Sequence, residues 1–144
     1  MKRSGEFNWA SDIFDGREWN DSYRLDGKEV PNPAKEGEEN FLVKVKDFGM
    51  DILSEDAIRW GLNEKSEFAP DGSRPATLAE GRAFAKAHPT LQLNFPVVLL
   101  GSFALRSGYR RVAVLDRCGG RRGLGGGWFD YGWGGGYRFL FVRK

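Results

Sequence analysis

The chain has very little of several residue types that commonly mark a chemical function. Its 144 residues include one cysteine and one histidine. A single cysteine excludes an internal disulfide framework, and a zinc site would lack its usual cysteine and histidine ligands. The longest apolar run, residues 95–100, is far shorter than the ~18 residues that a membrane-spanning helix needs. The sequence therefore favours a globular domain built around an ordinary hydrophobic core.

The length and the first residues of the chain bear on domain organisation and location. A chain of 144 residues predicts a single domain, here residues 1–144. The opening stretch, MKRSGEFNWASD, carries basic side chains but lacks the apolar stretch of a secretion signal. We therefore expect a protein that stays in the cytoplasm or is released by lysis.

Charge is distributed unevenly along the chain. Residues 1–100 hold 13 basic and 18 acidic side chains, whereas residues 101–144 hold nine basic and two acidic ones. The first part therefore has a net charge of −5 and the last part of +7, which sum to the +2 of the whole chain. A basic C-terminal part is typical of a protein that meets nucleic acid or an acidic partner, and also of a fold whose faces differ in charge.

The order of the expected elements indicates an α+β fold. Ser54 and Thr77 are candidate helix caps, Thr77 forms a capping-box pattern with Glu80, and Pro89 ends the second helix near His88. Short strands and turns such as Asp26-Gly27 fill the first 40 residues, and residues 29–40 form a polar loop. Further strands are expected at 41–48, 95–102, 110–116 and 137–144. Strands at both ends of the chain predict that the terminal strands pair.

The segment from Gly101 to Tyr137 has an unusual composition. Its 37 residues contain no Lys, Glu, Gln or Met, although the other 107 residues hold eight Lys and ten Glu. The segment contains six Arg and twelve Gly instead. Lys, Glu, Gln, Met and Trp share the property that none of their codons ends in a pyrimidine. Only Trp128 and Trp133 depart from this restriction within the segment.

The end of the chain, LGGGWFDYGWGGGYRFLFVRK, together with the upstream FPVVLLGS, resembles the variable proteins of diversity-generating retroelements. In that family a reverse transcriptase mutates template adenines, mostly in AAC or AAT codons, which explains codons that end in a pyrimidine. The resemblance covers residues 95–144, and it departs from the family at residues 125–128, where GGGW replaces the frequent Gly-Gly-Ser-Trp. It implies a C-type-lectin-like fold in which residues 101–137 are the variable region.

The resemblance also implies which residues touch a ligand and which support the fold. Trp128 and Trp133 look like fixed scaffold, and Phe139 and Phe141 belong to a framework strand. The residues expected on the variable, ligand-binding face are Arg106, Tyr109, Arg110, Arg117, Cys118, Gly119, Gly120, Arg121, Arg122, Gly125, Gly127, Asp130, Tyr131, Gly132, Gly134, Gly135 and Gly136. Tyr, Gly and Arg are typical of evolved binding surfaces, which supports non-covalent recognition of a protein or another macromolecular surface.

Two alternatives stay open for the same segment. The glycines also fit a set of tight turns that need positive φ. The arginines, interleaved with Tyr109, Trp128, Tyr131 and Trp133, also fit a nucleic-acid-binding module that holds phosphates and stacks bases. The absence of lysine argues against the second alternative, because a phosphate-binding surface ordinarily uses lysine alongside arginine.

The sequence indicates no enzyme, cofactor or metal. His88 is expected at a solvated helix end, and Cys118 lacks an obvious base partner. The stretch GLGGGWFDYG lacks the Gly-Lys-Ser/Thr ending of a phosphate-binding loop. Trp19–Asp21 and EVPNP share residues with calcium-dependent lectins but occur in the reverse order, so we expect no calcium-dependent sugar site. We therefore predict a non-catalytic binding protein.

Overall fold

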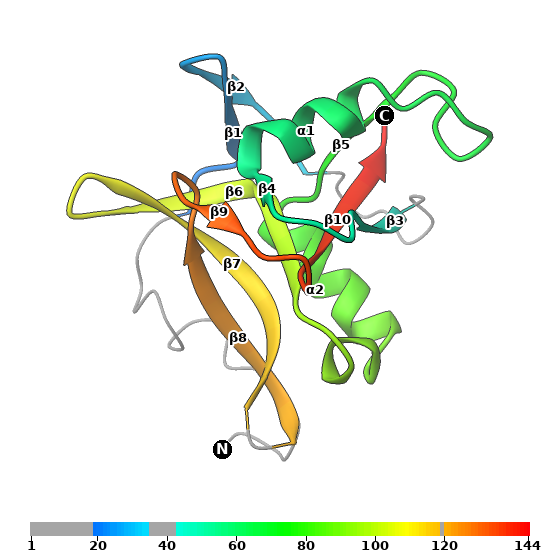
Figure 1. The fold of residues 1–144 in the computed structure, drawn as a ribbon, viewed down its shortest axis with the longest axis vertical. Helices are drawn as coiled ribbons and strands as arrows, with labels where there is room; N and C mark the ends of the chain where they lie inside the picture. Colours follow the sequence, from blue (N-terminus) through cyan, green and yellow to red (C-terminus); the bar gives the residue numbers. More distant parts are fainter. Residues whose placement is uncertain (1–18, 35–42, 119) are drawn as a thin grey trace.

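The computed structural model describes residues 19–34, 43–118 and 120–144 (Figure 1). The helices within these residues are α1 (Ser54–Leu62), α2 (Leu78–Ala87) and a short 3-10 helix, η1 (Leu91–Leu93). The strands are β1 (Ser22–Leu25), β2 (Lys28–Pro31), β3 (Val43–Asp47), β4 (Ile52–Leu53), β5 (Ser73–Pro75), β6 (Val97–Arg106), β7 (Tyr109–Cys118), β8 (Arg121–Trp128), β9 (Gly132–Trp133) and β10 (Arg138–Arg143).

One mixed sheet organises the fold. Its strands follow the order β3-β10-β6-β7-β8, and β5 also pairs with β10. All of these pairs are antiparallel except β10 with β6, which run parallel through Arg138 and Phe139. Two small separate ribbons, β1-β2 and β4-β9, lie outside this sheet. The α+β class predicted from the order of elements is therefore confirmed.

The sheet buries a hydrophobic core on each of its two faces. In β10, Phe139 and Phe141 join the cluster that contains Ile58 of α1, whereas Leu140 and Val142 join the cluster around α2. Side chains of a strand alternate between the two faces, so a strand covered on both sides reads as a continuous apolar run. This explains why residues 97–100 and 139–142 are almost wholly apolar and buried.

The second helix begins and ends where its sequence indicates. Thr77 accepts a hydrogen bond from the Glu80 amide, and the Glu80 carboxylate accepts one from the Thr77 amide, which completes the predicted capping box. The buried Glu80 carboxylate also pairs with Arg74, with 2.9 Å between Nη1 and Oε1. His88 closes the helix and remains exposed, as expected.

The predicted capping role of Ser54 is wrong. Leu53 occupies the cap position of α1 without a side-chain hydrogen bond, and Ser54 is already the first helical residue. Its side chain is buried and serves a different contact, with Phe129 and Trp133. A buried hydroxyl that already has partners in the core cannot turn back to its own helix end.

Two further expectations differ from the structure. Within the described residues, the last strand β10 pairs with β3, β5 and β6, while β1 pairs with β2, so these terminal strands do not pair with each other. The loop expected over residues 29–40 begins with strand β2, which the Asp26-Gly27 turn connects to β1; residues 35–40 lie outside the described part. Both turn residues have positive φ, 52° and 77°, which suits a tight hairpin.

The stretch Trp19–Asp21 attaches the first hairpin to the main sheet. Asn20 forms a β-bridge with Phe103, and the Asp21 carboxylate accepts a hydrogen bond from the Ser102 hydroxyl at 2.7 Å. These contacts give the stretch a structural role.

Strand β6 approaches β5 very closely at Gly101. The Asn32 amide donates to the carbonyl oxygens of Pro75 (3.0 Å) and Gly101 (3.1 Å), which ties the two strands together. A Cβ atom at Gly101 would lie only 2.4 Å from the carbonyl oxygens of Pro75 and Ala76. Only glycine fits at this position.

Candidate functional site

Much of the predicted variable region, residues 101–137, is regular strand. Strands β7 and β8 form a long twisted hairpin that projects from the body of the molecule (Figure 1). Strand β8 was not anticipated, because glycine is depleted in strands and RRGLGGGW carries four of them. Pairing with β7, which is rich in Val, Ala and Leu, holds these glycines in the sheet. The candidate residues therefore divide among strand faces, turns and the β9 segment.

Trp133 holds the β9 segment on the core, as its predicted scaffold role requires. Its indole is 5% exposed and donates to the Ser54 hydroxyl at 2.8 Å. That hydroxyl donates in turn to the carbonyl oxygen of Phe129, also at 2.8 Å. The indole also makes edge contacts with the rings of Tyr137 and Phe139. The predicted framework residues Phe139 and Phe141 are each 1% exposed.

Trp128, which was expected to serve as scaffold, is only half-buried and lies beside two candidate ligand contacts. The Tyr109 ring meets it edge-on at 6.2 Å, and the guanidinium of Arg111 lies over its ring at 4.9 Å. Tyr109 is 57% exposed. Arg111 and Trp128 are register partners across β7 and β8, so their side chains share one face of the hairpin.

Arg111 is a candidate contact that the sequence did not single out, because it reads as part of an apolar strand. Burial lowers the pKa of its guanidinium, and the positive charge of Arg106 lowers it further. Its Nε atom is buried and has no hydrogen-bond partner among the described residues. Gly126 provides the space for it, since a Cβ there would lie 2.6 Å from the Arg111 Nε.

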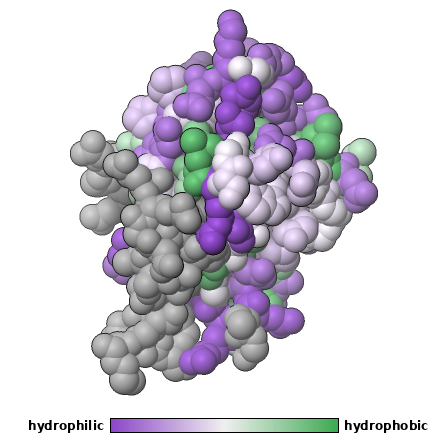
Figure 2. Space-filling model, turned by 90° about the vertical axis from the view of Figure 1, so that its left-hand side faces the viewer, coloured by the Kyte–Doolittle hydropathy of each residue, from purple (hydrophilic) through white to green (hydrophobic). Residues whose placement is uncertain are grey.

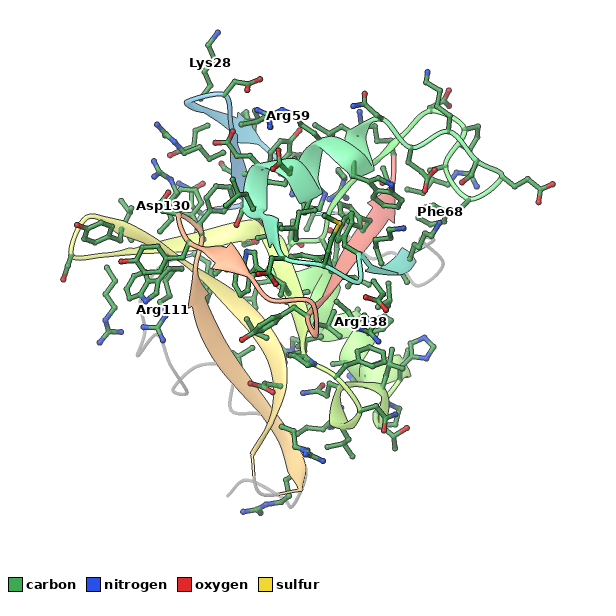
Figure 3. All side chains as sticks on the ribbon, in the orientation of Figure 1. Lys28, Arg59, Phe68, Arg111, Asp130 and Arg138 are labelled. Carbon is green, nitrogen blue, oxygen red and sulfur yellow. The ribbon has the colours of Figure 1, made fainter. Side chains whose placement is uncertain are left out.

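Arg106, whose charge acts on Arg111, completes what we call the aromatic–arginine cluster, with Tyr109, Arg111 and Trp128. Arg110 lies on the opposite face of β7, because neighbouring strand residues alternate. The Arg110 guanidinium lies over the Phe103 ring at 5.5 Å and 4.0 Å from the Glu29 carboxylate. Figure 3 shows Arg111 and Asp130 on the side of the molecule that carries the β6–β7 turn. Figure 2 shows this side, where pale residues of intermediate hydropathy gather among hydrophilic ones.

The tip of the β7–β8 hairpin, residues 117–122, lies apart from this cluster. Arg117 lies six residue steps along β7 from Arg111, which corresponds to about 20 Å. At the tip, Gly120 has a φ of 86°, which favours glycine for conformational reasons. The Arg122 guanidinium donates to the Ala85 carbonyl at the end of α2, at 2.8 Å. Arg117 and Arg121 are exposed, whereas Gly119 and the Cys118 side chain lie outside the described residues.

The remaining candidate glycines fall into two kinds. A Cβ at Gly127 would lie 2.3 Å from the buried Trp133 ring, so Gly127 belongs to the framework. The other positions leave room for a side chain: the nearest atom to a Cβ lies at 3.5 Å for Gly125, 3.6 Å for Gly132 and 3.4 Å for Gly135, and no atom lies within 4 Å at Gly134 and Gly136.

The open positions at Gly132 and Gly134 line a surface pocket. Asp130 and Tyr131 form the exposed turn before it, with Tyr131 65% exposed. The pocket has a volume of about 570 Å³ and lies on the β4–β9 ribbon; it is lined by Met50, Asp51, Ile52, Leu53, Asp56, Gly132, Trp133 and Gly134. The sequence did not point to the Met50–Leu53 stretch, because no residue pattern links it to the β9 segment.

The structure thus gathers part of the predicted site and leaves part of it elsewhere. The aromatic–arginine cluster lies next to the β6–β7 turn and the pocket lies on the β4–β9 ribbon, whereas the tip of the β7–β8 hairpin lies at a distance from the cluster. In the described part of the chain, no group of acidic, histidine or cysteine side chains has the arrangement of a metal site. Among the described helices, none has the length and apolar character needed to span a membrane. No protein-family model, curated protein or solved structure matches the chain.

Proposed function

We propose that this chain is a non-catalytic ligand-binding protein that displays diversified side chains on a C-type-lectin-like scaffold. In this proposal residues 101–137 are the variable region, and the target is a protein or another macromolecular surface. The observation that carries the proposal is the contrast within this one segment between the buried, hydrogen-bonded Trp133 and the open positions beside it at Gly132 and Gly134.

The position of the tryptophan agrees with the codon restriction. A diversified AAC or AAT codon cannot become a tryptophan codon, so tryptophans in the segment should be invariant. Trp133 is buried and hydrogen-bonded to Ser54, which is a structural role that suits an invariant residue. At its neighbours Gly132 and Gly134 an added side chain would face solvent, so many side chains would fit there without disturbing the core. Exposed Tyr109 and Tyr131 supply the amphipathic contact area that is common in evolved binding surfaces.

The test is a DNA measurement that is independent of the protein's ligand. We expect a near-copy of the DNA that encodes residues 101–137 downstream of the gene, beside a reverse transcriptase gene. The copy should differ from the gene mainly where the copy has adenine. The codons of Trp128 and Trp133 should be identical in both. A genome without such a copy, or with differences spread over all four bases, would contradict diversification.

The aromatic–arginine cluster favours a second candidate function, binding of single-stranded nucleic acid. Arg111 lies over the Trp128 ring beside Tyr109, and Arg106 is close enough for its charge to act on Arg111; cations with aromatic rings suit phosphates and stacked bases. A fluorescent single-stranded DNA oligonucleotide, titrated at several salt concentrations, tests this candidate. Binding should weaken steeply with salt, by about 0.7 in the logarithmic slope for each phosphate contacted, and should weaken in Arg111→Met. An affinity for the oligonucleotide that changes neither with salt concentration nor in Arg111→Met rules this candidate out.

A further inference from the structure

The β4–β9 pocket has chemical features that specify its occupant more closely than the proposed function does. Its mouth carries two large apolar side chains, Met50 and Leu53, which are 64% and 57% exposed. Trp133 also lines the pocket, although its indole is almost fully buried in the core. Exposed apolar side chains around a hollow mark a surface that another molecule covers. Methionine adapts its shape to different partners.

Glycine at two positions keeps this pocket open. In β9 the Trp133 side chain points into the core, so side chains at positions 132 and 134 would point outward, because neighbouring residues of a strand face opposite sides. A Cβ at Gly132 would lie 3.6 Å from the Leu53 Cδ2 atom, and a Cβ at Gly134 would meet no atom within 4 Å. Larger side chains fit at both positions and would occupy the hollow.

The charged side chains that line the pocket are all acidic. Asp51 is exposed, and Asp56 is half-exposed with its carboxylate 3.1 Å from Arg59. No described lining residue is basic, and Asp51 forms no ion pair with a described residue. A cation placed beside the apolar mouth would be attracted, and an anion would be repelled.

We propose that this pocket receives a protruding loop of a protein partner, which carries an apolar side chain beside a lysine or arginine. The inference rests on the proposed function, since it names the partner that this copy of the variable region would select. A hollow with an apolar mouth fits a partner that projects a side chain better than it fits a partner with a flat surface. The carboxylate of Asp51 selects the basic neighbour. Positions 132 and 134 determine specificity, because a larger residue at either one would close the hollow.

The experiment uses the full chain and a displayed library of short disulfide-closed peptide loops with random sequences. We expect the selected loops to be enriched in an apolar residue adjacent to lysine or arginine. Gly132→Tyr, which fills the pocket, should lower the affinity of the selected loop by about tenfold or more. Ala83→Tyr is the matched control, because position 83 is an exposed small residue of α2 that does not line the pocket, and it should bind as the unchanged protein does.

A second variant isolates the charge. Asp51→Asn keeps the shape of the side chain and should lower the affinity for the selected loop by about two- to fivefold. The affinity of this variant should also depend less on salt concentration. Thermal unfolding of each variant shows whether the fold is retained. Selection of acidic loops, failure to select any loop, or equal binding to Gly132→Tyr in a folded protein would overturn the inference. Diversification itself would still stand or fall with the downstream DNA copy, so the two failures are distinguishable.

Discussion

Two groups of glycines in the same segment have opposite environments. At Gly101 and Gly127 a Cβ would lie 2.4 Å and 2.3 Å from neighbouring atoms, whereas at Gly134 and Gly136 it would meet no atom within 4 Å. Gly127, Gly134 and Gly136 all stand in stretches that are similarly rich in glycine. Composition therefore cannot separate a glycine that the fold requires from a glycine that merely leaves a position empty. The packing of neighbouring strands makes that distinction.

The largest expected effect is that of Gly101→Ala. The added methyl group would press on the backbone carbonyl oxygens of Pro75 and Ala76, which no side-chain rotation relieves. We expect the free energy of unfolding to fall by about 3 kcal/mol, at the upper end of the range for overpacking. Urea denaturation of this variant beside Gly134→Ala measures the difference. Equal midpoints for the two variants would show that the two groups do not differ.

A smaller loss is expected when the indole of Trp133 is shortened. Trp133→Phe removes the hydrogen bond to Ser54 and leaves unfilled space in the core, which together cost about 2 kcal/mol. The matched variant is Trp128→Phe, whose indole is half-buried and should cost less than about 1 kcal/mol. Urea denaturation compares them. If Trp128→Phe is the more destabilising of the two variants, Trp128 rather than Trp133 has the main framework role.

Gly127→Ala is expected to cost about 1–2 kcal/mol, since the new methyl would meet a ring that has some freedom to shift. The ring atoms involved, Cη2 and Cζ3 of Trp133, are absent from phenylalanine. Gly127→Ala should therefore cost less in the Trp133→Phe background than in the unchanged protein. A double-mutant cycle measures this coupling free energy. Strict additivity would mean that contact with the Trp133 ring is not the reason why position 127 requires glycine.

Much of the fold could be predicted because local patterns and burial agree. The capping-box pattern of Thr77 and Glu80 is enough to predict where a helix starts, and the apolar run of β6 predicts a strand that is buried on both faces. Ser54 was misassigned because a serine before acidic residues looks the same whether it caps a helix or bonds to the core. Strand β8 could not be predicted, because its pairing with β7 overrides the low strand propensity of glycine.

The candidate site was predictable only in part, for a related reason. Sequence composition marked the segment, and the exposed Tyr109 and Tyr131 lie in it. The pocket, however, needs Met50 and Leu53, which reach the segment only through the pairing of β4 with β9. Arg111 was not predicted as a contact residue, because what distinguishes it is its position over the ring of Trp128 on the neighbouring strand. Contacts between distant parts of the chain leave no local pattern in the sequence.

The smallest effects are expected at the open positions, where Gly134→Ala and Gly136→Ala should leave the protein equally stable or slightly more stable. Neither glycine has a positive φ, and a Cβ meets no atom within 4 Å at either, so alanine fits without strain. Alanine also restricts the unfolded chain, which adds up to about 0.4–1 kcal/mol per site. Urea denaturation of the double variant shows whether the gains add. A clear loss of stability would mean that these positions carry structural constraints, and that glycine stands there because the turn requires it rather than because the position is free to vary.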